Sequence, residues 1–214
     1  MLDIQRVDVS IGATPILRAV SLAVPAGALC GVIGRNGAGK TTLMRAIVGA
    51  LPTRSGRITL EGIDLRSLPP YRRAQMGIGY MPEDRRLVPE LNAEDNILVP
   101  AWASRRREAA ERLRATYEVI PELRGLAGRR ATQLSGGQQK IVALARALAG
   151  GTRLLLLDEP LEGVAPALAE RISDVIGGLK RSGVSALVAE SDTKGLTRAL
   201  DRLYVIERGS ITPG

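Results

Sequence analysis

The apolar residues of this chain fall into short runs separated by polar or glycine-rich segments, a pattern typical of buried strands alternating with helices. The clearest run, LCGVIG at residues 29–34, is followed by a glycine-rich loop and by TLMRAIVGA at 42–50. In that second segment apolar residues three and four positions apart share one face, so a helix is expected. Further strands are expected within residues 2–10, 17–24, 56–65, 78–81, 154–158, 185–189 and 203–207, and further helices at 69–75 and 166–181.

The middle of the chain has a different character. Residues 103–130 are rich in Arg, Ala and Glu at helical spacing. We therefore interpret residues 88–148 as a helical lobe inserted into an α/β core formed by residues 1–87 and 149–214. Strands that alternate with helices favour a mostly parallel sheet covered on both faces.

Composition supports a folded chain with an aliphatic core. Apolar residues make up 45% of the 214 residues, whereas aromatic residues make up 2% and Phe is absent. The one cysteine, Cys30, lies in a predicted buried strand and is expected to be a packed thiol. A disulfide within the chain is impossible, which fits a reducing compartment. Because the sequence has no His, a His-ligated metal site is excluded.

The net charge of +8 leaves two interpretations open. The positive charge can attract an anionic partner such as phosphate, nucleic acid or a membrane surface, or it can belong to a basic surface that faces only solvent. The N-terminal MLDIQRVDVS is too polar for a secretory signal, and no run of about 18 apolar residues could span a membrane. Any role at a membrane is therefore expected to go through a partner.

The strongest chemical signal is GRNGAGKT, which joins a predicted strand to a predicted helix. It matches the P-loop pattern, in which glycines let consecutive backbone N–H groups surround a phosphate and the helix N-terminus adds its positive end. Lys40 is expected at the β- and γ-phosphates, and the Thr41 hydroxyl is expected to bind Mg²⁺. The predicted nucleotide-binding residues of this segment are Gly34, Arg35, Asn36, Gly37, Ala38, Gly39, Lys40, Thr41 and Thr42.

The second signal is LLLLDEP at residues 154–160. Asp158 and Glu159 end a predicted buried strand, at the edge where open α/β sheets bind ligands. Asp158 is expected to hold Mg²⁺ directly or through water, and Glu159 is expected to orient or deprotonate the attacking water. An apolar run that ends in Asp-Glu is common in proteins and by itself indicates little. Downstream of a P-loop, it indicates metal-binding and catalytic carboxylates.

The third signal is LSGGQQK at residues 134–140, which precedes an amphipathic helical pattern. Ser135 and two glycines then stand at a helix N-terminus, where an anion can bind. An ordinary helix cap would explain the serine equally well. The residues of the segment favour the anion-binding device over an ordinary cap. The P-loop, LSGGQQ and LLLLDEP in this order resemble the ATPase subunit of ATP-binding-cassette (ABC) transporters, and the resemblance covers the whole chain.

The resemblance implies the ABC ATPase fold: a P-loop NTPase core with a mostly parallel sheet, an N-terminal antiparallel β subdomain and an inserted helical subdomain. It also implies a head-to-tail dimer, in which the P-loop of one subunit and the LSGGQ of the other enclose one ATP. Ser135 and Gly137 are accordingly expected at the γ-phosphate of the partner's ATP, with Gln138 in the same nucleotide-binding set. The helical lobe and the Pro82-Glu83 loop are expected to form a groove for membrane subunits. The arginines at 105–107, 112 and 114 are interpreted as a solvated face.

Two details are similar to ATPases of branched-chain amino acid, amide and urea uptake systems. Glu83, within MPEDRR, stands where many ABC ATPases have Gln, and Glu162-Gly163-Val164-Ala165-Pro166 stands where many carry Leu-Asp. The resemblance then implies an importer ATPase at the inner face of the cytoplasmic membrane. Its partners would be a second ATPase subunit, two transmembrane permease subunits and, indirectly, a solute-binding protein. Thr41, Asp158 and Glu83 are the expected Mg²⁺ ligands.

Two positions depart from the family pattern. The family usually has an aromatic residue near position 11 that stacks on adenine, and here Ile11 offers an aliphatic face instead. The family usually has a His after the strand at 185–189, and here Ser191 takes its place. Because losing one polarising donor typically costs about 10²–10³ in rate, we expect a slow ATPase in which Glu159 is the main catalytic group.

Two other functions stay open at this point. The chain could be a nucleotide-gated clamp that dimerises on ATP but barely hydrolyses it. Its pI of about 10.3 also prompts a nucleic-acid-acting ABC protein. That class generally carries long coiled-coil inserts or two cassettes, and since this chain has neither, nucleic acid is not expected as a partner.

Overall fold

The computed structural model describes residues 1–103, 108–192, 195–196 and 199–214. The strands are β1 (Leu2–Ile11), β2 (Thr14–Val24), β3 (Leu29–Ile33), β4 (Ser55–Leu60), β5 (Ile63–Asp64), β6 (Ile78–Met81), β7 (Leu154–Asp158), β8 (Ser185–Glu190), β9 (Arg202–Glu207) and β10 (Ser210–Pro213). The α-helices are α1 (Lys40–Val48), α2 (Pro70–Gln75), α3 (Ala93–Ala103), α4 (Ala109–Val119), α5 (Gly136–Gly150) and α6 (Pro166–Ser182). Short 3₁₀ helices cover Leu65–Ser67, Pro121–Leu126 and Ala131–Gln133.

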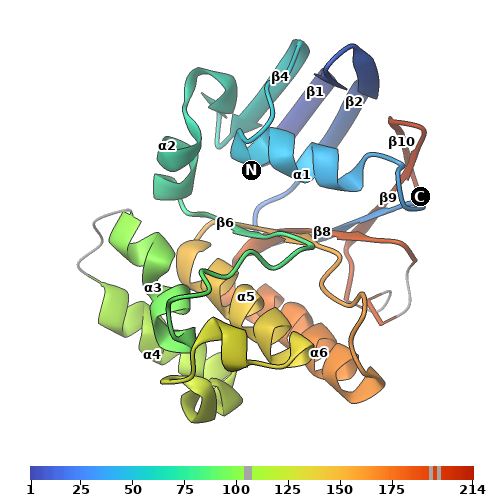
Figure 1. Cartoon of the computed structure of the whole chain (residues 1–214). Coiled ribbons are helices and arrows are strands. Elements are labelled where there is room, and N and C mark those ends of the chain that lie inside the picture. The colour runs from blue at the N-terminus through green and yellow to red at the C-terminus, as the bar shows by residue number, and fades with distance from the viewer. Residues whose placement is uncertain (104–107, 193–194, 197–198) are drawn as a thin grey trace.

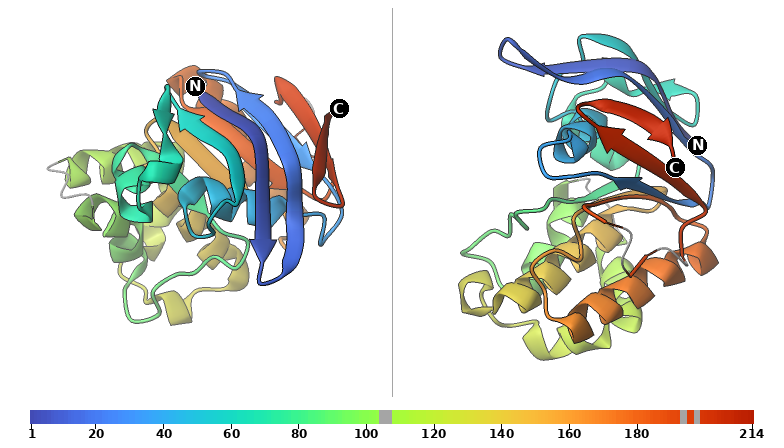
Figure 2. Two further views of the ribbon diagram at one scale, coloured as in Figure 1. Left: turned by 90° about the horizontal axis from the view of Figure 1, so that it is seen from above. Right: turned by 90° about the vertical axis from the view of Figure 1, so that its right-hand side faces the viewer.

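Two sheets and the helices between and below them form stacked layers (Figures 1 and 2). In the described part of the chain, one sheet has the order β2-β1-β4-β5 and is antiparallel throughout. The other has the order β10-β9-β3-β8-β7-β6 and is parallel except for the β9-β10 pair. Helix α1 lies between the sheets, and α5 and α6 cover the opposite face of the larger sheet (Figure 1).

The sequence of β7 shows why the larger sheet sits between two apolar layers. Leu154 and Leu156 point into the cluster shared with α1 and the antiparallel sheet, whereas Leu155 and Leu157 point into the cluster shared with α5 and α6. Successive side chains of a strand alternate between faces, so a run of four leucines fills both layers. All five residues of β7 are buried.

Parallel pairing places four strand ends at one edge of this sheet. Strands β3, β6, β7 and β8 run in the same direction, so the segments after Ile33, Met81, Asp158 and Glu190 leave together. This is the edge at which open α/β sheets bind ligands. The P-loop, the Glu83 segment, the Asp158-Glu159 pair and Ser191 therefore meet there.

The α/β class, the mostly parallel sheet and the antiparallel N-terminal sheet are confirmed. Cys30 is buried, and burial raises its pKa to about 11, as a packed thiol requires. Strand β10, within the final GSITPG, was not predicted. Residues 88–148 contain α3, α4 and most of α5, and their status as a separate subdomain stays a prediction.

The interpretation of the central arginines as a solvated face is wrong for one of them. The Arg112 guanidinium donates to the backbone oxygen of Ala149 over 3.1 Å and pairs with Glu108 over 3.3 Å, with its side chain 16% exposed. It therefore ties α4 to the end of α5. Arg114 is exposed, as expected, and residues 105–107 lie outside the described residues. Within those described residues, no helix combines the length and apolar character needed to cross a bilayer.

Candidate nucleotide-binding site

The P-loop joins β3 to α1 in the predicted way. Gly37 and Gly39 have φ angles of 81° and 115°, in the region that favours glycine. A Cβ atom at Gly34 would collide with the backbone oxygen of Ile206, so a larger residue would push the loop away from β9. Among the described residues, no side chain caps the N-terminus of α1, which leaves its first backbone N–H groups for a phosphate.

Lys40 is held over the loop by oxygen atoms. Its ammonium lies 3.0 Å from Oε1 of Glu159, and the two side chains are 3% and 5% exposed. It also donates to the backbone oxygens of Gly34 and Arg35. The lysine thus occupies a buried position among acceptor oxygens, and the β- and γ-phosphates of a nucleotide would offer it further acceptors.

The oxygens expected to bind Mg²⁺ lie close together. The Thr41 hydroxyl donates to Oδ1 of Asp158 over 3.2 Å and lies 3.5 Å from Oε2 of Glu83. Tyr80 donates to the other oxygen of Asp158 over 3.3 Å. Hydroxyl and carboxylate oxygens are the ligands that Mg²⁺ prefers, and spacings of this size suit two ligands of one octahedral ion. The residues therefore fit the ion.

Asp158 shows the electrostatic consequence of this crowding. Burial raises the pKa of Asp158 to about 6, and the negative charge of Glu83 acts in the same direction. The hydrogen bond from Thr41 opposes this rise. A site that disfavours its own carboxylate charge gains from a bound divalent cation, which favours the ionised form.

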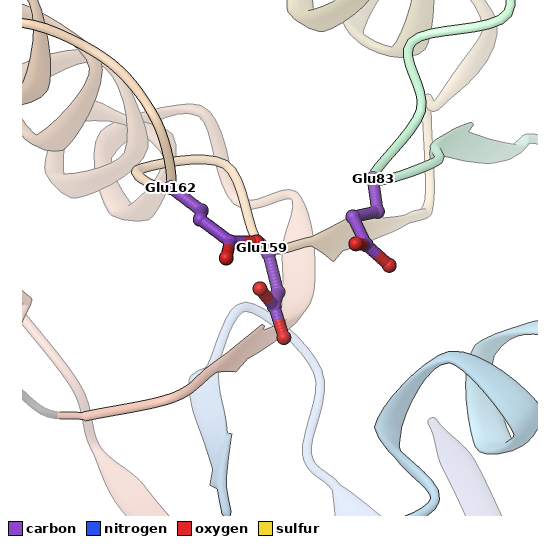
Figure 3. A group of neighbouring side chains, drawn as sticks. All are labelled: Glu83, Glu159 and Glu162. Carbon is purple, nitrogen blue, oxygen red and sulfur yellow. The ribbon is translucent and has the colours of Figure 1, made fainter. Parts of the chain in front are cut away.

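Glu159 lies at the centre of the site, between Glu83 and Glu162 (Figure 3). Carboxylate oxygens of these three glutamates lie within 4.8 Å of one another. Burial disfavours the charge of Glu159, but its contacts with Glu162 and Lys40 outweigh burial and lower its pKa. Contact with Glu159 conversely raises the pKa of Glu162. Glu159 is therefore the ionised member of the pair and the stronger candidate for a base.

Ser191 reaches the same place from the end of β8. Its hydroxyl lies 2.9 Å from Oδ1 of Asn36 and 3.4 Å from Oε1 of Glu159. The ammonium of Lys40 lies 3.5 Å from the same hydroxyl. The structure thus brings the P-loop, Glu159 and Ser191 together, as the sequence predicts.

The LSGGQ segment is placed differently. Ser135 caps α5 by accepting from the backbone N–H of Gln138, and the Gln138 side chain accepts from the backbone N–H of Ser135 in return. Ser135 is exposed and Gly137 is half-buried. The part of the chain that the structure describes places neither of them, nor Gln138, in the lining of the P-loop cavity. Within one chain, the two predicted phosphate-binding devices are separate.

The cavity at the P-loop has a volume of about 330 Å³. Its lining residues are Ile16, Asn36, Gly37, Gly39, Lys40, Thr41, Thr42, Glu83 and Glu159. Ile16, on β2, was missed by the sequence reasoning. Ile11 is not among these described lining residues and is 50% exposed at the end of β1, so its role beside adenine stays a prediction. The expected strand at 17–24 begins one residue after Ile16, so the sequence pattern contained no signal for it.

Known proteins resemble this chain over nearly all of its length. A family model described as ABC transporter matches residues 17–162. The chain is 34% identical over 211 residues to the high-affinity branched-chain amino acid transport ATP-binding protein BraG of Pseudomonas aeruginosa, covering 99% of this chain and 91% of that protein. It is 33% identical over 202 residues to the lipopolysaccharide export system ATP-binding protein LptB of Escherichia coli, covering 92% and 82%.

The fold has solved counterparts as well. The dimeric structure of MJ0796, described as a bacterial ABC transporter cassette, matches with a TM-score of 0.88 at 24% identity, covering 99% of this chain and 96% of that one. The family match includes Lys40, Asp158 and Glu159 and ends at Glu162, so Ser191 lies beyond it. The region that matches the family model is therefore the part that carries the P-loop and the Asp158-Glu159 pair.

Proposed function

This chain belongs to the ABC transporter family as an ATP-binding subunit, and from that premise we propose that it hydrolyses MgATP at a two-subunit interface to drive import of a small polar solute. The observation that carries the proposal is the meeting of Lys40, Thr41, Asp158 and Glu159 at one sheet edge. A buried cation, a hydroxyl and two carboxylates at a P-loop are the groups that phosphoryl transfer to water requires.

The proposed roles follow from the contacts. The P-loop backbone and Lys40 bind the phosphates, while Thr41 and Asp158, with Glu83 beside them, hold Mg²⁺. The ion, when bound, neutralises phosphate charge. Glu159 accepts a proton from the attacking water, because its contacts with Glu162 and Lys40 lower its pKa and keep it ionised. Ser191 donates its hydroxyl proton to the Asn36 or Glu159 side chain and so helps to orient them.

A second subunit completes the site in this proposal. Ser135 and Gly137 stand at the N-terminal tip of α5, outside the P-loop cavity of their own chain. A helix N-terminus binds anions, so this tip is suited to the γ-phosphate held by a partner. The dimeric state of the MJ0796 cassette supports the arrangement. The partner is a second copy or a paralogue.

The transmembrane partners are proposed to dock beside the helical lobe, residues 88–148, and the Pro82-Glu83 loop. A hollow of about 170 Å³ lies there, lined in part by Tyr80, Pro100 and Arg146. Two large apolar residues, Tyr71 and Trp102, are 60% and 49% exposed. Two permease subunits would hold the ATPase pair at the cytoplasmic face of the membrane.

We propose a branched-chain amino acid or a related amide as the solute. BraG, a branched-chain amino acid transport ATP-binding protein, matches 99% of this chain, and Glu83 and the Glu162–Pro166 segment support the same solute class. Lipopolysaccharide export is the second candidate, because LptB is nearly as similar.

Uptake in the organism that encodes the chain separates these candidates. Deleting the gene is expected to abolish a fraction of radiolabelled leucine, isoleucine or valine uptake, or of amide uptake, and the wild-type gene should restore it. Glu159→Gln should not restore it. Unchanged uptake together with an envelope that becomes permeable to antibiotics would favour export instead.

The slow-ATPase hypothesis rests on Ser191. Replacing Ser191 with His is expected to raise the turnover of the assembled complex by up to about 10²–10³-fold, because a longer, chargeable donor returns to the γ-phosphate. Steady-state phosphate release measures the effect. Ser67→His, on an exposed 3₁₀ turn, serves as the control. A wild-type rate typical of ABC ATPases, with no gain in Ser191→His, would contradict the hypothesis.

A further inference from the structure

Two buried ionisable residues contact the turn that follows Glu159. Lys140 on α5 is 2% exposed, and Glu190 at the end of β8 is 6% exposed. Neither is among the described residues that line the P-loop cavity. Since burying an ionisable group is costly unless it is well paired, a lysine and a glutamate at these two buried positions call for a structural reason.

Lys140 reaches across from α5 to the turn. Its ammonium donates to the backbone oxygen of Glu162 over 2.5 Å. Burial lowers the pKa of Lys140, and the negative charge of Glu190 opposes that change. The Lys140 side chain therefore links α5 to the main chain of the turn through a buried hydrogen bond.

Glu190, at the end of β8, contacts the same turn. Its Oε1 accepts from the backbone N–H of Leu161 over 2.8 Å. Its own backbone oxygen accepts from the N–H of Gly34, the first P-loop glycine, over 3.1 Å. One residue thus contacts both the turn and the phosphate-binding loop.

The turn needs such support because its first residue is strained. Glu159 has a φ angle of 50°, in the left-handed region that non-glycine residues rarely adopt. Conformations of this kind are unfavourable and persist only where surrounding contacts impose them. The turn itself contributes one bond of 3.3 Å, from the N–H of Glu162 to the oxygen of Glu159.

We infer that Lys140 and Glu190 are positioning residues for ATP hydrolysis, which hold the Glu159–Glu162 turn so that the Glu159 carboxylate faces the P-loop. Figure 3 shows Glu159 and Glu162 on this turn. Lys140 lies two residues after Gln138, near the N-terminus of the helix whose tip carries Ser135. Lys140 therefore also connects α5, the helix proposed to meet the partner's nucleotide, with the turn that carries Glu159, the proposed general base of its own site. The inference rests on the proposed role of Glu159.

The test compares Lys140→Met and Glu190→Ala with the wild-type chain in steady-state ATP hydrolysis over a range of MgATP. Both variants are expected to lower kcat by about 10- to 100-fold, as small misplacements of a catalytic group do. KM should stay within about threefold, since neither residue lines the nucleotide cavity. Glu190→Gln keeps an acceptor for the Leu161 N–H and should recover most of the wild-type kcat.

Two further measurements separate positioning from folding. In a Glu159→Gln background, adding Lys140→Met should leave the ATP-dependent dimer unchanged, because the binding surfaces remain. Lys180→Met, which removes an exposed lysine paired with Asp201, is the matched control and should behave as wild type. If Lys140→Met does not fold, the contrast between Glu190→Ala and Glu190→Gln decides alone.

The outcomes divide clearly. Wild-type kcat in Lys140→Met and Glu190→Ala, with Glu159→Gln inactive, overturns the inference and leaves the proposed function standing. An equal loss in Glu190→Ala and Glu190→Gln, or a parallel loss of nucleotide binding, also overturns it. A wild-type chain without turnover overturns both proposals.

Discussion

Replacing Glu159 with Gln is expected to slow ATP hydrolysis by about 10²–10⁴-fold, the usual contribution of a general base. Glutamine has nearly the same shape but cannot accept the proton of the attacking water. The change also releases Lys40 from its 3.0 Å ion pair, so nucleotide affinity should be maintained or improved. The variant should therefore accumulate as a dimer with MgATP, which light scattering after size-exclusion chromatography would detect.

The matched control is Glu122→Gln. The Glu122 side chain is 41% exposed, and within the described residues it forms an ion pair with Arg171. It is expected to hydrolyse ATP as the wild type does. Turnover of Glu159→Gln within about threefold of wild type would contradict a general base here, whose loss costs at least about 10². The chain would then act as a nucleotide-gated clamp.

Replacing Lys40 with Met should have the second largest effect, on nucleotide binding. Losing one buried charged partner typically costs about 2–5 kcal/mol, which corresponds to about a 30- to 4,000-fold weaker Kd. Titration with a fluorescent ATP analogue would measure this loss. An affinity close to wild type would show that the P-loop backbone alone binds the phosphates.

The same substitution is expected to destabilise the nucleotide-free protein. Glu159 would keep a buried charge without its cation, and breaking a buried pair in this way costs about 3–5 kcal/mol. Lys40 holds the pKa of Glu159 down, so the deficit should be present at neutral pH and should shrink as acidification protonates Glu159. Lys40→Met combined with Glu159→Gln should regain stability but not affinity, a comparison that thermal unfolding can make. Equal stability of both variants would contradict this account.

The strand-loop-helix order around the P-loop was readable from sequence because it depends on neighbours in the chain. Residues 29–48 carry a buried strand, glycines at the left-handed positions and an amphipathic helix in succession. The Ser135 cap of α5 is equally local, since its partner Gln138 lies three residues away. The acidic pair after β7 was found for the same reason: an apolar run and the carboxylates that end it are adjacent.

The contacts between these segments depend on sheet order, which the sequence pattern does not contain. Strand β8 lies between β3 and β7, and this places Ser191 and Glu190 beside the P-loop from more than 150 positions away. Ile16 of β2 lines the cavity together with residues of the P-loop and of α1, which follow it by about 20 positions or more in the chain. Similarly, Tyr80 reaches Asp158 because β6 and β7 are paired.

Sequence alone therefore determined which groups can bind a triphosphate, because glycine φ angles, helix termini and adjacent carboxylates are properties of contiguous residues. Only the tertiary structure decided how those groups face one another, including the Lys40–Glu159 pair and the support of the Glu159 turn by Lys140 and Glu190. The physical reason is that such contacts form between strands and helices far apart in the chain, and their free energy depends on burial that exists only after the sheet has assembled.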